Sequence, residues 1–148
     1  MIVYRIVFHE FAGSLEASGR PARWNSTDHK MIYSAGSVSL ACLENVVHRS
    51  SEGLSGLFKI LVIEIPEELS FDEIRISDLP ENWTDFTNVN VTRLIGDKWL
   101  IKKTAVAMKV PSVIVPQESN ILINPGHPDF SKIRIIETRD FNFDKRIK

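Results

Sequence analysis

The longest apolar run of the sequence, Ile60–Ile63, most strongly limits what this chain can fold into. It lies within a stretch from Leu57 to Ile65 that is typical of a strand, and Pro66 ends that strand. A transmembrane helix needs about 20 apolar residues, so this run is far too short to cross a bilayer. We therefore expect it to be a buried strand in a protein that has no membrane contact.

The other predicted elements place the chain in the α+β class. Further strands are expected near residues 2–8, 31–35, 71–76, 106–110, 112–116, 120–124 and 133–137. One helix is expected from Ser37, a typical N-cap, to about His48, and a second over 91–103. Strands outnumber helices and do not alternate with them strictly, which favours α+β over a doubly wound fold. No repeat or linker divides the chain, so residues 1–148 are expected to form one compact domain.

Composition excludes several classes of function. The hydrophobic fraction of 43% suffices for a core, and a net charge of -1 argues against binding nucleic acid directly through bulk charge. Cys42 is the only cysteine, which rules out an intramolecular disulfide and a cysteine zinc site, and none of the four histidines stands at metal-ligand spacing. We expect no bound metal. The first eight residues resemble a strand and lack the pattern of a signal peptide, so we expect a cytoplasmic protein.

Glu44 is the most informative single residue of the predicted first helix. On a helix that begins at Ser37, the side chains of Leu40, Leu43 and Val47 form an apolar stripe, and Glu44 lies at its edge. A carboxylate at that edge is costly to bury unless it is paired or faces a cleft. The spacing leaves two interpretations open, a flanking glutamate whose tip reaches water and a carboxylate of a functional site.

Three further features are candidates for binding a ligand. Arg5 lies inside an apolar strand, where it needs an anion such as a phosphate unless it is on a solvent face. Arg20 and Arg23 lie in a glycine-containing loop and could bind a diphosphate with their forked donors, or the loop could simply be solvated and anchored by Trp24. Tyr33 could stack on a planar ring while its hydroxyl stays in water, or it could be a core aromatic.

Taken together and in this order, the motifs resemble the RES domain, which is named for its arginine, glutamate and serine. The segments that carry the resemblance are Tyr4-Arg5; Gly19 followed by Arg23-Trp24-Asn25; Tyr33-Ser34-Ala35; Ser37, Leu40-Ala41, Leu43-Glu44 and His48; Gly96-Asp97 and Trp99; Val110-Pro111-Ser112 with Val115-Pro116; and Asn120, Leu122-Ile123-Asn124-Pro125 and His127-Pro128. The chain departs from the pattern where Pro21 and Ala22 separate Arg20 from Arg23, and we favour Arg23 as the ligand-binding arginine.

The resemblance implies a fold similar to that of ADP-ribosyltransferase toxins and an activity on NAD. Members of the family hydrolyse NAD, cleave it with phosphate or transfer its ADP-ribose to a protein, so NAD is expected as the substrate and no cofactor is expected. The positions that match the family's NAD site are Arg5, Arg23, Tyr33, Glu44 and Ser112, with Asn120 as a weaker candidate.

Each of these residue types suits one part of the implied reaction. Cleavage of the bond between nicotinamide and ribose passes through an oxocarbenium-like state, which a carboxylate at Glu44 would stabilise. Arg5 and Arg23 would neutralise the pyrophosphate. Tyr33 would stack on the nicotinamide, and Ser112 would offer its hydroxyl to the ribose or to the nicotinamide amide.

The resemblance also implies a biological setting, that of the toxin in a toxin–antitoxin system. The expected partner is an antitoxin that carries a helix-turn-helix DNA-binding part and covers the active site, and toxin homodimers would be in character. Two other functions remain open, a non-catalytic module that holds a partner through the Trp24 loop, and a ribonuclease toxin with His48 or His127 as its base. A module need not keep Arg5, Arg23, Tyr33 and Glu44 together, and this chain has all four.

Overall fold

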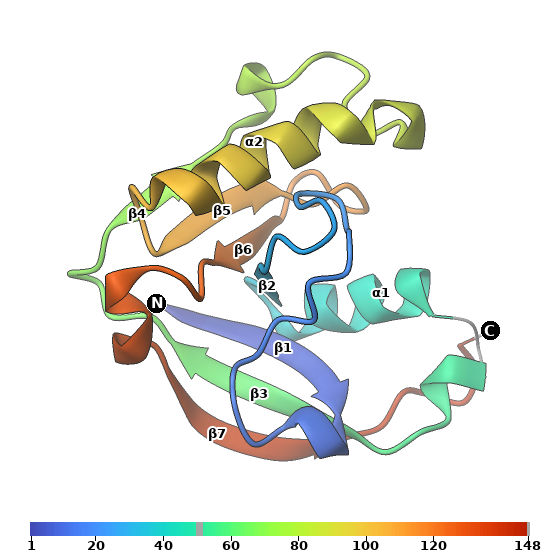
Figure 1. Cartoon of the computed structure of the whole chain (residues 1–148). Helices are drawn as coiled ribbons and strands as arrows, with labels where there is room; N and C mark the ends of the chain where they lie inside the picture. Colours follow the sequence, from blue (N-terminus) through green and yellow to red (C-terminus); the bar gives the residue numbers. More distant parts are fainter. Residues whose placement is uncertain (50–51, 148) are drawn as a thin grey trace.

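A seven-stranded sheet with two α-helices makes up the computed structural model, which describes residues 1–49 and 52–147 (Figure 1). The strands are β1 (Ile2–Phe8), β2 (Ile32–Ala35), β3 (Phe58–Glu64), β4 (Phe71–Glu73), β5 (Ala107–Pro111), β6 (Ser119–Ile123) and β7 (Arg134–Phe141). The helices are α1 (Val38–His48) and α2 (Val89–Lys102). Short 3-10 turns cover His9–Phe11, Glu52–Leu54, Ile76–Asp78, Phe86–Asn88 and Pro128–Lys132. The predicted α+β class is confirmed.

The sheet consists of two groups of strands that meet at one residue pair. The strand order is β4-β5-β6-β2-β1-β3-β7. β1 pairs with β3 along its whole length, and β2 pairs with β6 along all four of its residues, but β1 and β2 pair only through Tyr4 and Ala35. The long segment between β1 and β2 passes across this junction (Figure 1). The weak junction leaves room for side chains to line a cavity between the two groups.

The two helices cover different parts of this sheet. α1 buries Leu40 and Ala41 in a cluster with Ile6 of β1, while α2 buries Trp99 and Leu100 in a cluster with residues of β5 and β6. Ser37 is the N-cap of α1, as predicted, because its Oγ accepts a hydrogen bond from the backbone N–H of Leu40 at 3.1 Å.

Several predicted boundaries need correction. The strand expected near 112–116 is wrong, because this segment forms a turn in which the hydroxyl of Ser112 accepts the backbone N–H groups of Ile114 and Val115, both at 3.1 Å. The strand expected over 71–76 ends at Glu73 and is followed by a 3-10 turn. The second helix begins two residues earlier than expected, at Val89.

Candidate active site

A cavity of about 530 Å³ lies where β1, β2 and α1 meet the loop that follows Ser18. Its size is within the range of small-molecule sites. The lining residues include Arg5, Arg23, Tyr33, Glu44 and Asn120, five of the six residues predicted as site residues. The sixth predicted residue, Ser112, is fully buried beneath the lining. Arg20 is exposed and does not line the cavity, so of the two candidate loop arginines only Arg23 reaches it.

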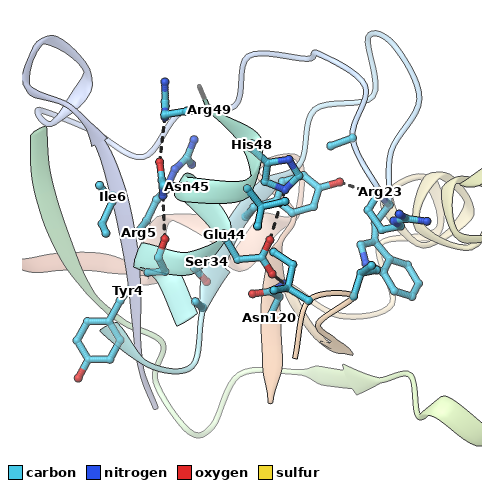
Figure 2. Close-up of a pocket in the computed structure, with 18 of the residues that line it drawn as sticks. Tyr4, Arg5, Ile6, Arg23, Ser34, Glu44, Asn45, His48, Arg49 and Asn120 are labelled. Atoms are coloured by element: carbon cyan, nitrogen blue, oxygen red, sulfur yellow. Dashed lines mark hydrogen bonds and ion pairs between the residues drawn. The ribbon is translucent and has the colours of Figure 1, made fainter. Parts of the chain in front are cut away.

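Glu44 is held in the cavity by hydrogen bonds from three side chains (Figure 2). Its Oε1 accepts the hydroxyl of Ser112 at 3.0 Å and the side-chain amide of Asn120 at 2.6 Å, while its Oε2 lies 3.4 Å from Nε2 of His48. Burial raises the pKa of Glu44, but the hydrogen bonds from His48, Asn120 and Ser112 outweigh burial and hold the pKa below its ordinary value. The carboxylate is therefore ionised at neutral pH, and it is not a flanking group that reaches into water.

The apolar stripe predicted on the first helix is wrong in two of its three members. Leu40 is buried, but the side chains of Leu43 and Val47 are 37% and 56% exposed. The reason is that α1 rests on the sheet through Leu40 and Ala41, which turns the other side of the helix toward solvent and the cavity. Val47 lines the cavity beside Glu44.

Ser112 contacts the site through Glu44. Its hydroxyl donates to Glu44 and accepts two backbone N–H groups in the turn after β5. A single hydroxyl proton cannot be given both to Glu44 and to a ligand. The geometry thus shows Ser112 positioning the carboxylate, and its direct contact with ribose or nicotinamide stays a prediction of the resemblance.

Arg5 brings an unneutralised cation to the cavity. Its Nη1 is buried and has no hydrogen-bond partner in the part of the chain that the structure describes. Burial lowers the pKa of this guanidinium. The alternative of an arginine on a solvent face is thereby excluded. A buried guanidinium without a partner is costly, and an anionic ligand in the cavity would supply the missing acceptor.

Arg23 is carried by a loop that is anchored to α2. Thr92 donates its hydroxyl to the backbone carbonyl of Arg23 at 2.5 Å, and Nε of Arg93 donates to the carbonyl of Ala22 at 2.8 Å. The Arg23 guanidinium itself makes only two long hydrogen bonds, of 3.4 Å each, to backbone carbonyls in the segment before α2. Burial and the nearby charge of Arg93 lower the pKa of Arg23. Its donors remain available to an anion.

The Gly96-Asp97 motif explains why the loop and α2 fit together. A Cβ on Gly96 would lie 1.7 Å from the carbonyl oxygen of Trp24, so only glycine allows this contact. The carboxylate of Asp97 accepts the backbone N–H of Ser26 at 2.9 Å. The motif thus fixes the loop that carries Arg23.

Tyr33 presents its ring to the cavity, but its hydroxyl is not in water as expected. The hydroxyl donates to Oδ1 of Asn25 at 2.5 Å and accepts the backbone N–H of Trp24 at 3.0 Å. Burial raises the pKa of Tyr33 well above its usual range, so the phenol stays protonated. Asn25, which is fully buried, also donates to the carbonyls of Arg20 and His29 and thereby ties the loop to the tyrosine.

Sequence reasoning did not single out Asn45 and Arg49, two cavity residues that contact each other. They are four apart on and just after α1, and Nε of Arg49 donates to Oδ1 of Asn45 at 3.1 Å. The signal that could have found them is this i,i+4 spacing beside Glu44. The two histidines of the ribonuclease hypothesis do not meet, since His48 lines the cavity while the ring of His127 caps a 3-10 turn elsewhere.

Within residues 1–49 and 52–147, no group of three or more His, Cys, Asp or Glu side chains could hold a metal ion. Over the same described residues, no helix has the length and apolar character needed to cross a membrane.

Comparison with known proteins gives one consistent result. The model of the RES domain family matches residues 2–144. The chain is 35% identical to a protein named Toxin Res from Yersinia enterocolitica serotype O:8 / biotype 1B, over all of both chains. It is 38% identical to a protein named Prs ADP-ribosylating toxin from Sphingobium sp. strain YBL2, over 84% of this chain and 79% of the relative. Its fold matches a chain in the crystal structure of the M. tuberculosis MbcT–MbcA toxin–antitoxin complex, with a TM-score of 0.74, 15% identity and coverage of 95% and 84% of the two chains.

Proposed function

Because this chain belongs to the RES-domain family, we propose that it is the toxin of a toxin–antitoxin system and that it cleaves the bond between the nicotinamide and ribose of NAD. The observation that carries the proposal is the Glu44 carboxylate, which is ionised, fixed by Ser112 and Asn120, and exposed to a cavity. The same cavity holds the guanidinium of Arg5, whose Nη1 has no partner among the described residues. An anion to stabilise positive charge and a cation to bind phosphate are the two groups this reaction needs.

In the proposed reaction the C1′–N bond of the ribose breaks, and its electron pair leaves with the nicotinamide, whose ring nitrogen thereby loses its positive charge. The ribose is left with positive charge shared between C1′ and its ring oxygen, as in glycoside cleavage. Oε2 of Glu44 faces this charge while Oε1 is held by its two donors. An acceptor oxygen then bonds to C1′ and gives up its proton to solvent.

The other site residues bind and orient the substrate in this proposal. Arg5 and Arg23 contact the diphosphate, which carries two negative charges. The ring of Tyr33 forms a wall of the cavity on which the planar nicotinamide can stack. Asn120 positions Glu44, as Ser112 does, since its amide donates to the same carboxylate oxygen. NAD is the substrate, and the reaction needs no further cofactor.

An antitoxin partner is the second part of the proposal. The relatives from several bacteria are named toxins, and the structural neighbour is a toxin–antitoxin complex. We propose an antitoxin that covers the cavity and carries a helix-turn-helix part that binds DNA, with two toxin copies in the assembly. The exposed apolar side chains of Leu43 and Val47 beside the cavity offer a surface for such a cover.

Transfer of ADP-ribose to a protein is a second candidate function. The Sphingobium relative that is named an ADP-ribosylating toxin favours it. The two candidates share the cleavage step and differ only in the acceptor, which is water or phosphate in one and a protein side chain in the other. Incubation with labelled NAD and a bacterial lysate separates them, because only the second leaves label on a protein.

The test of the proposal is product identification from NAD with purified, antitoxin-free protein, in phosphate buffer and in phosphate-free buffer. We expect release of nicotinamide. Glu44→Gln keeps the shape and loses the charge, so the rate should fall by about a hundredfold or more, while binding of ADP-ribose should change little. Glu67→Gln, at an exposed position outside the cavity, is the matched control. Intact NAD in both buffers, or full activity of Glu44→Gln, would contradict the proposal.

A further inference from the structure

Arg49 is a third arginine on the cavity, and the proposed function gives it no role. Its guanidinium carbon lies 4.4 Å from the ring centre of Phe8 and 5.3 Å from that of Phe58. Its Nε donates to Oδ1 of Asn45, whose own amide donates to the carbonyl of Ala41 at 2.9 Å (Figure 2). Asn45 therefore acts as a spacer that fixes Arg49 relative to α1.

These contacts orient Arg49 without neutralising it. No carboxylate of residues 1–49 and 52–147 forms an ion pair with it, and burial lowers the pKa of its guanidinium. An aromatic face attracts a cation weakly and leaves its N–H donors free to point elsewhere. An arginine that is held by its flat face and one edge is prepared to receive an anion on its remaining donors.

Arg5 and Arg49 belong to the same end of the cavity. Both line the cavity, Arg5 from β1 and Arg49 from the C-cap position of α1, where its guanidinium packs on the rings of Phe8 and Phe58. In the view of Figure 2, Arg5 and Arg49 lie on one side of Glu44 and Arg23 lies on the other. The contacts of Arg23 agree with this, because they run to the segment before α2.

Two guanidinium groups line this end of the cavity, and within residues 1–49 and 52–147 neither is paired with a carboxylate, so an anion bound there would supply the acceptors that both lack. We propose that Arg5 and Arg49 form a phosphate-binding subsite, the Arg5–Arg49 subsite, in which Asn45 positions Arg49. The phosphate group is one phosphate of the diphosphate of NAD, whose other phosphate faces Arg23, or it is a free phosphate ion, and both offer the same oxygen acceptors. The identity of this ligand rests on the proposed function, but the subsite itself rests on the geometry.

The test is calorimetric titration of the full chain with three probes: inorganic pyrophosphate, ADP-ribose and nicotinamide riboside, which has no phosphate. In Arg49→Gln the Kd for pyrophosphate and for ADP-ribose should rise about tenfold or more, the scale of a lost hydrogen bond to a charged group. The Kd for nicotinamide riboside should not change. Arg139→Gln is the matched control, because Arg139 is an exposed arginine of β7 outside the cavity, and it should leave all three Kd values unchanged.

Unchanged binding of both phosphate probes by Arg49→Gln, with only a lower melting temperature, would overturn the subsite and leave Arg49 a structural contact of Phe8 and Phe58. Should Arg49→Gln fail to fold, Arg49→Lys replaces it; lysine keeps the charge but not the fork, and we expect a smaller rise in the same two Kd values. If the Arg49→Lys variant bound both phosphate probes as tightly as the wild type does, that result would also count against the subsite.

Enzyme kinetics distinguish the two sources of the phosphate, and they also distinguish failure of the subsite from failure of the proposed function. If Arg49→Gln has a higher KM for NAD than the wild type in phosphate-free buffer, the ligand of the subsite is the diphosphate of NAD. If the variant differs from the wild type only in how its rate depends on added phosphate, the ligand is the free ion. If the wild type leaves NAD intact, the proposed function fails, yet weakened pyrophosphate binding by Arg49→Gln still supports the subsite. If NAD is cleaved and Arg49→Gln binds pyrophosphate normally, only the subsite fails.

Discussion

Glu44 and Arg5 both carry charge to the cavity, but in the part of the chain that the structure describes only the carboxylate has hydrogen-bond partners. Oε1 of Glu44 has two donors, whereas Nη1 of Arg5 has none in the described part of the chain. A charge removed from water without a partner opposes folding, so the two residues should affect stability in opposite ways. Each difference can be measured by a single substitution.

Replacing Arg5 by methionine keeps much of the side-chain volume and removes the unpartnered charge. We expect the melting temperature of Arg5→Met to equal or exceed that of the wild type, while binding of ADP-ribose weakens by about 1.5–3 kcal/mol. Thermal denaturation and titration measure the two effects. Arg75→Met, at an exposed position, should change neither. A melting temperature of Arg5→Met several degrees below that of the wild type would show that Arg5 stabilises the packing and is not held in place for a ligand.

The lowered pKa of Glu44 implies that the contribution of this residue to stability depends on pH. A carboxylate whose pKa is lower in the folded state stabilises the fold above its ordinary pKa of 4.5, and this contribution is lost as the pH falls through the folded-state value. The difference in unfolding free energy between wild type and Glu44→Gln should therefore grow as the pH rises from 3 to 7. Denaturant unfolding at a series of pH values measures it. A difference that is flat with pH, or that shrinks toward pH 7, would contradict the hydrogen-bonded carboxylate.

At this scale the sequence could indicate residue types but not their partners. Arg5 and Glu44 stand out as charges in apolar patterns, and the resemblance to a family then selects Arg23 and Tyr33. The contact between Ser112 and Glu44 joins residues 68 apart in the chain, so no local pattern reveals it. The hydroxyl of Tyr33 was expected to contact water, but it donates to Asn25. The loop that brings the two residues together has no pattern that predicts this contact.

Among the elements, α2 determines where Arg23 lies. The helix contacts the preceding loop through Thr92, Arg93 and Asp97, and Gly96 allows the two backbones to approach. The sequence indicated this motif only through a resemblance, and its physical role is this close approach. The loop that carries Arg23 is thus held by α2, although none of the residues of α2 lines the cavity.

Gly96→Ala tests this dependence. The new Cβ would lie 1.7 Å from the carbonyl oxygen of Trp24, which is backbone and cannot rotate away, so the loop must move. We expect a loss of about 1–3 kcal/mol in stability and a higher KM for NAD, because Arg23 moves with the loop. Gly13→Ala is the matched control, since a Cβ at Gly13 would have nothing within 4 Å. If Gly96→Ala and Gly13→Ala had the same stability and the same KM for NAD, the proposed dependence of Arg23 on Gly96 would be wrong.

The turn after β5 shows where pattern-based prediction of elements failed. Residues 112–116 contain valine and isoleucine between prolines, a composition typical of a strand. The hydroxyl of Ser112 captures two backbone N–H groups that a sheet would need, so the chain turns instead. Apolar composition records which residues prefer burial, but it does not record a competing side-chain acceptor. That same turn brings Ser112 to Glu44.

For the whole molecule, the important feature is the junction between the two groups of strands. β1 and β2 meet only through Tyr4 and Ala35, and the cavity takes residues from both groups, Arg5 from β1 and Asn120 from β6. The α+β class and most of the helices and strands could be predicted from the sequence, although the strand expected at 112–116 is not part of the seven-stranded sheet. The single-pair junction could not be predicted, because pairing between strands depends on contacts far apart in the chain. The site exists because the sheet is incomplete at its middle.

A ligand that contacts both groups should therefore strengthen the molecule as a whole. At a concentration of ADP-ribose about 100 times its Kd, binding to the folded state adds about 2.7 kcal/mol, which for a chain of this length corresponds to a rise of roughly 5–10 °C in melting temperature. Hydrogen exchange should slow most at the backbone amides around Tyr4 and Ala35, where the two groups join. Nicotinamide alone has no phosphate to pair with Arg5 and should give a much smaller rise. Arg5→Met, at the same ADP-ribose concentration, should lose most of the shift. A shift of equal size in Arg5→Met, or protection confined to the surface of α2, would place the ligand outside this cavity.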